Sequence, residues 1–323
     1  MKKIIFLQDS DELICDIKAA CKSTIETIGF NQIKTSKGLV NIYEGTILDY
    51  YHTDEIGTVS NELIKERIES ALTHFEEPLK IDDFYHTLSM RQNFRKKIDV
   101  NYKKKENKQF NSFANPEIRN YILENEGQYD KTNNPQGKVF VGSNLEADDR
   151  IGIAATHFYN KFTKEGYNVK IIVSSQDKDM KTIPNIWIYN HKTNEMKYNS
   201  YEDAIRFWFN QILMGDRADG VTNYPQGFGK DTAPAFINKH WDKGLVELYR
   251  LIKLEYTNNN FLCKETRNRV YKNIESQCLI NAQLLRILTI DFFDTTTQEP
   301  ILFQESHLEF LQEQLNRELQ NTF

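Results

Sequence analysis

Two aspartates, Asp177 and Asp179, stand one residue apart shortly after an apolar run of the sequence. The run, residues 169–173, is rich in β-branched side chains and predicts a strand, so both carboxylates are expected just beyond a strand end. An isolated Asp-x-Asp triplet also fits a solvated turn, because Asp and Ser are ordinary turn residues. Carboxylates this close repel each other unless a cation neutralises them, so the pair is a candidate for metal binding.

Three further acidic clusters occupy comparable positions. One acid follows a predicted first strand, a Glu-Ala-Asp-Asp run follows a short predicted strand, and an Asp-x-x-Asp pair follows a predicted helix. These residues are Asp9, Glu146, Asp148, Asp149, Asp216 and Asp219. Each cluster alone has a simpler explanation, since the macrodipole favours acids at a helix N-terminus and Gly-Asp runs are common in turns.

The chemistry of these acids depends on whether they converge. If the strands are parallel neighbours, the clusters that follow three of them meet at one edge of the sheet, where α/β proteins bind ligands. Crowded carboxylates need cations, and hard oxygen ligands select magnesium or manganese. Two such ions about 4 Å apart form the usual clamp for in-line displacement at a phosphodiester. Convergence therefore predicts phosphoryl chemistry.

The apolar pattern predicts the elements that must position these acids. The expected strands and helices cover residues 4–7, 10–28, 50–75, 139–142, 169–173 and 201–214. Ser143 or Asn144 could cap a helix that begins near the Glu-Ala-Asp-Asp run. Strands that alternate with helices indicate an α/β fold with a mostly parallel central sheet flanked by helices. The last helix carries a stripe that is expected to pack on the body, formed by Leu308, Leu311, Leu315 and Leu319.

The composition is that of an ordinary globular chain. The 323 residues include 39% hydrophobic and 27% charged side chains, and no apolar stretch approaches the roughly 18 residues that span a bilayer. We therefore expect a cytoplasmic protein with no membrane partner. The four cysteines lack the paired short spacing of a zinc site; they are Cys15, Cys21, Cys263 and Cys278.

Positive charge is concentrated in one segment, although the formal net charge is -5. Residues 91–108 carry eight basic and two acidic side chains, with Phe94 and Tyr102 among them. Arg95 and Tyr102 are seven residues apart, which places them on one face if the segment is helical. Such a segment could pair with phosphates and stack on a base, or it could be a solvated face anchored by two aromatic rings.

Two glycines, Gly227 and Gly229, precede another predicted helix. They allow a tight turn, and Asp231 or Thr232 could cap the helix and leave backbone amides to face an anion such as a DNA phosphate. A two-glycine turn before a helix is common, so this signal has little specificity.

Taken in order, five motifs resemble those of the 5′ nucleases of the flap-endonuclease superfamily, namely FLQDSD, FRKKIDVNYKK, LEADDRIG, VSSQDKDMKTIPN and MGDRADGVTNYPQGFGKDTA. The stretch DKDMKTIPN is most similar to the 5′→3′ exonucleases of short-tailed bacteriophages. The resemblance implies a PIN-like α/β core over 1–200 with a basic helical arch or clamp at about 84–125. It also implies a helical DNA-binding region over 201–323 with a helix-three-turn-helix element at about 214–240.

The resemblance also implies roles for individual residues. Arg95 matches the basic residue at the base of the arch, and Lys103, beside Tyr102, matches the lysine that contacts the scissile phosphate, so both are expected to act in catalysis. The expected ligands of two Mg²⁺ or Mn²⁺ ions are Asp9, Glu146, Asp148, Asp149, Asp177, Asp179, Asp216 and Asp219. The expected DNA contacts are Arg95, Lys96, Tyr102, Lys103, Lys104, Gly227, Gly229, Lys230 and Thr232, with a monovalent cation such as K⁺ at the helix-three-turn-helix element.

Two departures from the family pattern concern the site. The family carries an aspartate upstream of the arch arginine, whereas residues 88–90 (Leu-Ser-Met) hold no acid, and the nearest upstream acids are Asp82 and Asp83. Either a shifted loop supplies this ligand or the first metal is held less tightly. The Tyr-Lys pair is followed by Lys105 and Glu106 in place of Asn-Arg, which could reduce activity or alter the duplex preference.

The resemblance implies a divalent-metal-dependent 5′→3′ exonuclease that also cleaves 5′ flaps, in phage DNA replication, recombination or primer removal. Its substrates would be double-stranded DNA with 5′ ends, nicks or flaps, and RNA–DNA hybrids. One alternative keeps the fold without catalysis, as a protein that binds branched or 5′-ended DNA. A haloacid-dehalogenase-like phosphatase would need a threonine two residues after Asp179, where the chain has Lys181.

Overall fold

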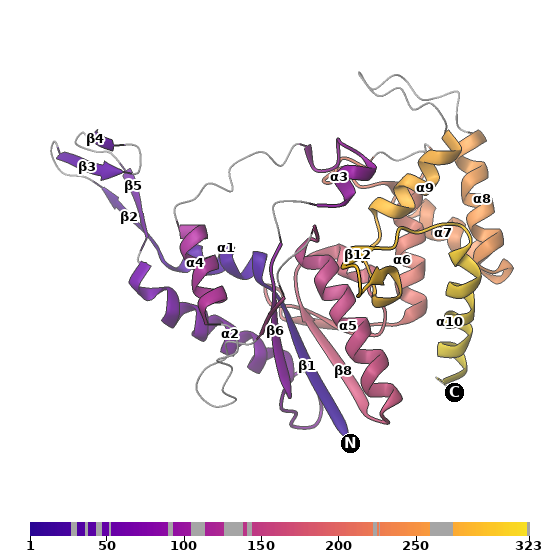
Figure 1. Cartoon of the computed structure of the whole chain (residues 1–323), viewed down its shortest axis with the longest axis horizontal. Helices are drawn as coiled ribbons and strands as arrows, with labels where there is room; N and C mark the ends of the chain where they lie inside the picture. The colour runs from indigo at the N-terminus through magenta and orange to yellow at the C-terminus, as the bar shows by residue number, and fades with distance from the viewer. Residues whose placement is uncertain are drawn as a thin grey trace.

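A six-stranded sheet forms the centre of the molecule in the computed structural model (Figure 1). The structure describes residues 1–26, 31–35, 38–42, 47–51, 53–89, 93–104, 114–125, 138–140, 144–221, 225, 227–258 and 274–321. The strands are β1 (Lys2–Asp9), β6 (Asp83–Thr87), β7 (Lys138–Phe140), β8 (Asn168–Ser174), β9 (Ile186–Asn190) and β10 (Glu195–Asn199). Their order is β10-β9-β8-β1-β6-β7, and every neighbouring pair is parallel except β9 and β10. The predicted mostly parallel α/β sheet is confirmed.

The central strands are apolar on both faces because helices cover the sheet on both sides. In β1, Ile4 and Phe6 pack into one core, whereas Ile5 and Leu7 pack into the other. All four side chains are almost completely buried. A continuous apolar run, without alternation, is what a strand covered on both faces requires.

Helices α1 (Ser10–Ala20), α2 (Ile56–Leu72) and α4 (Ala114–Glu124) lie on one side of the sheet, and α5 (Ala147–Lys164) lies on the other (Figure 1). The prediction of a helix from 10 to 28 is wrong after Ala20, where the helix ends and β2 (Lys22–Glu26) follows. Residues 27–28 lie outside the described part of the chain. β2 pairs with β5 (Ile47–Tyr51), which also takes the first residues of the helix predicted at 50–75. The β-branched Thr24 and Ile25 favour an extended chain once a partner strand is available.

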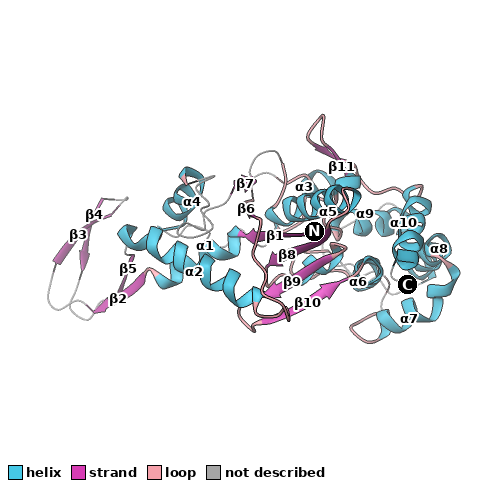
Figure 2. Cartoon of the chain, turned by 90° about the horizontal axis from the view of Figure 1, so that it is seen from below, coloured by secondary structure: helices cyan, strands magenta, loops and turns pink. Residues whose placement is uncertain are grey.

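A second hairpin, formed by β3 (Asn31–Thr35) and β4 (Gly38–Ile42), lies beside β2 and β5. Both views show these four strands extending away from the sheet and its helices (Figures 1 and 2). The helical spacing of apolar residues in α1 continues into β2 without a Gly or Pro between them. For that reason, periodicity alone did not locate the end of α1 at Ala20.

Helix α5 begins at Ala147, three residues after Asn144, the later of the two caps that the sequence pattern proposed. Its N-cap is Glu146, whose side chain and that of Asp149 form a reciprocal capping box. Asn144 lies before this cap, and Ser143 lies outside the described residues. Gly152 allows a close approach to the chain at Leu288, since a Cβ atom there would lie 2.2 Å from the Leu288 carbonyl oxygen.

The second half of the chain adds a helical body with its own core. It contains α6 (Tyr201–Met214), α7 (Thr232–His240), α8 (Leu245–Asn258), α9 (Ile274–Leu284), α10 (His307–Asn321), the short β11 (Phe293–Asp294) and β12 (Glu299–Pro300), and the 3₁₀ turns η4 (Trp241–Lys243) and η6 (Ile290–Phe292). Two further 3₁₀ turns, η1 (Thr53–Glu55) and η3 (Lys178–Thr182), belong to the first half.

The predicted apolar stripe of the last helix is mostly buried in this core. Leu308, Leu311 and Leu315 are buried, whereas Leu319 is 39% exposed. None of the helices in the described part of the chain is long and apolar enough to cross a membrane. Cys15, Cys21 and Cys278 are free thiols, and Cys263 lies outside the described residues.

Candidate metal centre and nucleic-acid interface

Asp9 stands at the carboxyl end of β1, where the chain turns into α1. Its Oδ1 atom caps that helix by accepting from the amides of Asp11 (3.2 Å) and Glu12 (3.4 Å). Its Oδ2 atom accepts from the hydroxyl of Ser175 at 3.1 Å, which lies just past the neighbouring strand β8. Burial, together with the charges of Glu12 and Asp11, raises the pKa of Asp9 well above its usual range.

Asp148, in the first turn of α5, faces the same place. Burial raises its pKa strongly, and the nearby charges of Asp9 and Asp177 raise it further. The clusters that contain Asp9, Asp148 and Asp177 therefore lie close together, as predicted. They do so although the strand before α5 is not a neighbour of β1. Strand β7, which precedes α5, is separated from β1 by β6, so the N-terminus of α5 must return across β6 to reach Asp9.

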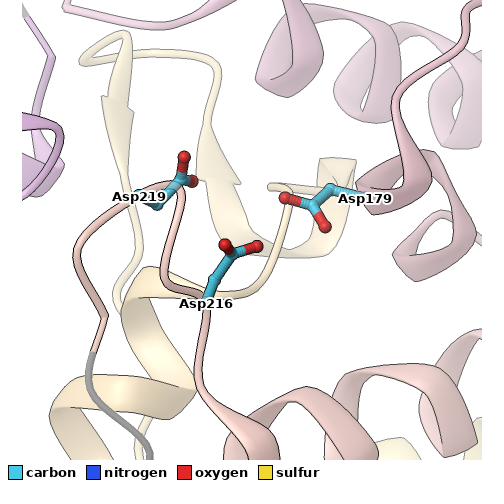
Figure 3. A group of neighbouring side chains, drawn as sticks. All are labelled: Asp179, Asp216 and Asp219. Carbon is cyan, nitrogen blue, oxygen red and sulfur yellow. The ribbon is translucent and has the colours of Figure 1, made fainter. Parts of the chain in front are cut away.

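Asp179, Asp216 and Asp219 form a second acidic group, called here the three-aspartate group. Each offers a carboxylate oxygen, and these oxygens lie within 4.8 Å of one another. Figure 3 shows the three side chains pointing toward a common space from two separate segments. Burial, and then the charge of Asp177, raise the pKa of Asp179 to about 6. Gln211 donates to Asp179 Oδ1 at 2.6 Å and fixes that carboxylate.

A tight turn after α6 positions the other two members of the group. Asp216 and Val221 exchange backbone hydrogen bonds of 2.9 and 2.7 Å, and the Ala218 amide donates to Asp216 Oδ1 at 2.8 Å. Gly220 has a φ of 74°, which favours glycine at this position of the turn. The Asp-x-x-Asp spacing therefore places both carboxylates on one compact loop.

Arg95 and Asp149 form a buried ion pair, and Asp149 is completely inaccessible. Arg95 donates to both Asp149 oxygens at 2.6 and 2.7 Å, and to Glu146 at 3.3 Å. Its remaining donors bind the carbonyl oxygens of Leu284 (3.0 Å) and Arg286 (2.7 Å). All five guanidinium N–H groups are thus used inside the protein. This differs from the expectation that Asp149 binds metal and Arg95 contacts DNA, because a bidentate buried pair leaves neither side chain facing solvent.

Tyr102 and Lys103 lie at the acidic edge, although the segment is not one continuous helix. Helix α3 (Arg95–Ile98) is a single turn, so the expected shared helical face of Arg95 and Tyr102 is wrong. The chain bends after it, and Lys103 adopts a φ of 50° with its amide bonded to the Asp219 carbonyl oxygen at 2.9 Å.

The side chains of this bend reach the acids directly. The Tyr102 hydroxyl donates to Asp219 Oδ2 at 3.0 Å, and the Lys103 ammonium donates to Glu146 at 2.9 Å. Burial alone would raise the pKa of Glu146, but Arg95 and Lys103 hold it below its usual value. Phe94 is buried, and the Arg95 Cζ atom lies 4.6 Å from the centre of its ring. This agrees with the alternative in which aromatic rings anchor the basic segment.

Lys178, the residue between Asp177 and Asp179, is a site residue that the sequence patterns did not single out. Its ammonium group donates to Asp216 Oδ2 at 2.5 Å and lies 3.8 Å from Asp179 Oδ1. Its position inside the Asp-x-Asp triplet was the available signal.

Two acids from α1 also reach the edge, whereas the upstream acids do not. The Ser89 amide donates to Asp11 Oδ2 at 3.2 Å, and the Gln176 amide donates to Glu12 at 2.9 Å. Asp82 accepts from the Ile4 amide, at the opposite end of the strands, so it cannot supply the acid missing near Ser89. Asp83 pairs with Lys3 at that same far end. The signal for Asp11 and Glu12 was their place directly after Asp9.

The two-glycine turn before α7 is held by Thr232. Its hydroxyl accepts from the Gly229 amide at 2.8 Å and donates to the Gly227 carbonyl oxygen at 2.9 Å. Gly227 has a φ of 94°, which favours glycine. The Gly229 amide is therefore already used, and it is not among the free amides that the start of this helix was expected to present to an anion. Exposed basic side chains that could meet phosphates are Lys96, Lys104 and Lys230, and both Lys105 and Glu106 lie outside the described residues.

Solved structures with a similar fold come from bacteriophage T5. A T5 protein co-crystallised with metal ions aligns over 88% of this chain and 90% of that chain, with a TM-score of 0.53 and 13% identity. The fold is that of a T5 nuclease. A T5 5′-exonuclease with bound divalent zinc ions gives a TM-score of 0.52, at 13% identity over 88% of this chain and 89% of that one. A T5 flap endonuclease complexed with DNA and metal ions gives 0.51, at 14% identity and the same coverage.

No family model and no curated protein sequence matches this chain. At 13–14% identity, the T5 structures define the fold of the chain. The PIN-like nuclease core expected from the motifs is confirmed at that level. The roles of individual residues depend on the geometry of the site.

Proposed function

We propose that this chain is a divalent-metal-dependent, structure-specific 5′ nuclease that acts on DNA. The observation that carries the proposal is the meeting of carboxylates from four separate segments, at the carboxyl ends of the strands, in a fold shared with T5 5′-exonuclease. Four segments of a chain rarely bring acids together at a cost in repulsion without a cation to offset it.

The donor set fits hard divalent cations. The three-aspartate group supplies oxygens within 4.8 Å of one another, and Asp9, Asp148 and Asp177 interact electrostatically as a second group. Carboxylate oxygens are the ligands that Mg²⁺ and Mn²⁺ prefer. Two such ions would activate water and stabilise the charge that develops during in-line displacement at a phosphodiester.

The chain's own basic residues would hold the nucleic acid. Lys103, whose ammonium lies 2.9 Å from Glu146 and 3.9 Å from Asp219, would contact the scissile phosphate. Exposed Lys96 and Lys104 on the same segment, and Lys230 near the two-glycine turn, would neutralise backbone phosphates. Thr232 would keep the turn in shape for the duplex backbone, with a monovalent cation such as K⁺, in a helix-three-turn-helix element within 214–240.

The geometry alters two assignments. Asp149 and Arg95 act here as a positioning pair that fixes α3 against α5, and Asp11, which accepts from the Ser89 amide, brings a carboxylate to the place where residues 88–90 carry none. We assign 1–200 to the catalytic core and 201–323 to the helical DNA-binding region. The proposed reaction is 5′→3′ exonucleolytic and flap cleavage near DNA 5′ ends, with RNA–DNA hybrids as further substrates, in phage replication, recombination or primer removal in the host cytoplasm.

A second candidate is a catalytically inactive protein that binds 5′-ended DNA. It is favoured by the end of β6, where Thr87, Leu88 and Ser89 provide no carboxylate at the metal edge. The two candidates differ in whether phosphodiester bonds are broken.

The deciding experiment compares 5′-labelled and 3′-labelled duplexes digested with Mg²⁺, with Mn²⁺ and with a chelator. We expect short products from the 5′ label alone, only when metal is present. Asp177→Asn should abolish cleavage and retain DNA binding, while the matched variant Asp83→Asn, at the opposite end of the sheet, should cleave normally. Intact duplexes in every condition, with DNA still bound, would establish the inactive candidate instead.

A further inference from the structure

Lys178 neutralises the three-aspartate group from within the metal-binding segment itself. Its ammonium lies 2.5 Å from Asp216 Oδ2 and 3.8 Å from Asp179 Oδ1, so it contacts two of the three carboxylates that the group offers. The Asp216 side chain is 4% exposed, and a buried carboxylate needs a partner of this kind. Burial would lower the pKa of Lys178, but its hydrogen bond to Asp216 and the charge of Asp179 raise it instead.

The Lys178 ammonium group can leave the two carboxylates because most of the side chain is exposed to solvent. Its side chain is 56% exposed, although its ammonium reaches a buried acid. Lys103, which contacts Glu146 at the same edge, is 18% exposed and lies beside Tyr102. Lys178 can therefore exchange its carboxylate contacts for water by rotating its side chain, without rearrangement of the surrounding core.

We propose that Lys178 is an internal counter-ion that divalent metal must displace from Asp179 and Asp216, so that it sets the metal affinity of the three-aspartate group. A divalent ion bound by the same oxygens would stand within a few ångströms of the ammonium group, and two cations at that distance repel each other. Metal binding is thus an exchange of one cation for another. The inference rests on the proposed metal site. A substitution in a binding site usually weakens binding, whereas removal of the Lys178 charge is predicted to strengthen metal binding.

The test is calorimetric titration of Mn²⁺ into the metal-free full-length protein, without DNA. Lys178→Gln removes the charge, and Lys178→Met removes it while keeping an apolar stem. We expect both variants to bind Mn²⁺ more tightly than the wild type, by roughly fivefold, the scale of a partly exposed charged contact. Both should also lose thermal stability when metal is absent, because the buried Asp216 carboxylate then lacks the ammonium group that offsets its charge.

The matched control is Lys181→Gln, which changes net charge equally on the same 3₁₀ turn. Lys181 stacks on the Phe207 ring at 5.7 Å and should leave the Mn²⁺ affinity within about twofold of the wild type. If this control tightens binding as much as Lys178→Gln, the effect is general electrostatics and the inference is wrong.

The remaining outcomes separate the inference from the proposed function. Weaker or unchanged Mn²⁺ binding in both Lys178 variants, with normal binding by the wild type, would show that Lys178 does not compete with the metal and would overturn the inference alone. A wild type that binds no Mn²⁺ would refute the proposed metal site, and the inference with it. Near-native circular dichroism of each variant is the folding control.

Discussion

The Arg95–Asp149 pair and the three-aspartate group with Lys178 both place a basic side chain against buried acid at one edge of the sheet. The two differ in how many hydrogen-bond donors of the basic side chain are bound by the protein. Arg95 is 3% exposed and all its donors bind protein, whereas Lys178 is more than half exposed and makes one close hydrogen bond. The first arrangement is permanent, and the second can exchange its cation.

The comparison shows that an acidic motif is not one functional unit. In the Glu-Ala-Asp-Asp run, Asp148 faces the other acids, but Asp149 turns into the protein and also accepts from the Leu288 amide at 3.1 Å. A planar guanidinium that binds both oxygens of a carboxylate fixes two helices in register, which a lysine cannot do. Neighbouring acids on one helix turn can therefore serve ligand binding and framework positioning separately.

The largest expected effect comes from breaking the permanent pair. Arg95→Leu leaves the buried Asp149 carboxylate without its ion-pair partner, and should lower the free energy of unfolding by about 3–5 kcal/mol. Urea denaturation with and without metal measures this. Lys96→Leu, on the exposed side of the same helical turn, is the control and should change stability little. A loss under about 1 kcal/mol for Arg95→Leu would mean that the pair is not the framework we describe.

The three-aspartate group, unlike the Arg95–Asp149 pair, should make the stability of the protein depend on metal. Mn²⁺ at about 100 times its dissociation constant should stabilise the wild type by about 2.7 kcal/mol through mass action. Asp216→Asn should lose most of that gain, since it removes a ligand, while Asp83→Asn keeps it. Thermal unfolding across a Mn²⁺ series provides the comparison. Equal stabilisation of Asp216→Asn and the wild type would place the bound metal elsewhere.

The smallest effect tests the link between the two regions. Tyr102→Phe removes the hydroxyl that donates to Asp219 at 3.0 Å and lies 3.3 Å from Glu146, and should cost about 1 kcal/mol of stability. Because Asp219 loses a fixed donor, Mn²⁺ affinity should shift as well, measurable in the same titration. Unchanged stability and affinity together would show that Tyr102 does not couple the arch segment to the metal edge.

The local elements that carry the site were predictable because their signals are local. The apolar run before Asp177 gave a strand, and six apolar residues of the helix at 201–214 are buried on one face. The boundary at Ala20 was not predictable from periodicity, because the choice between helix and strand there depends on pairing with β5. The helical interpretation of the basic segment failed for the same reason, since Tyr102 and Lys103 are placed by contacts with Asp219 rather than by helix periodicity.

The sequence by itself determined which chemistry was available, because carboxylates at strand ends and lysines in a basic segment are fixed by residue type and order. Tertiary structure alone decided which acid meets which cation. Asp149 pairs with Arg95 across 54 positions, Asp216 with Lys178 across 38, and Asp11 reaches Ser89 across 78. Such pairings depend on how β1, β6 and α5 pack at one edge, and distance along the chain carries no information about that packing.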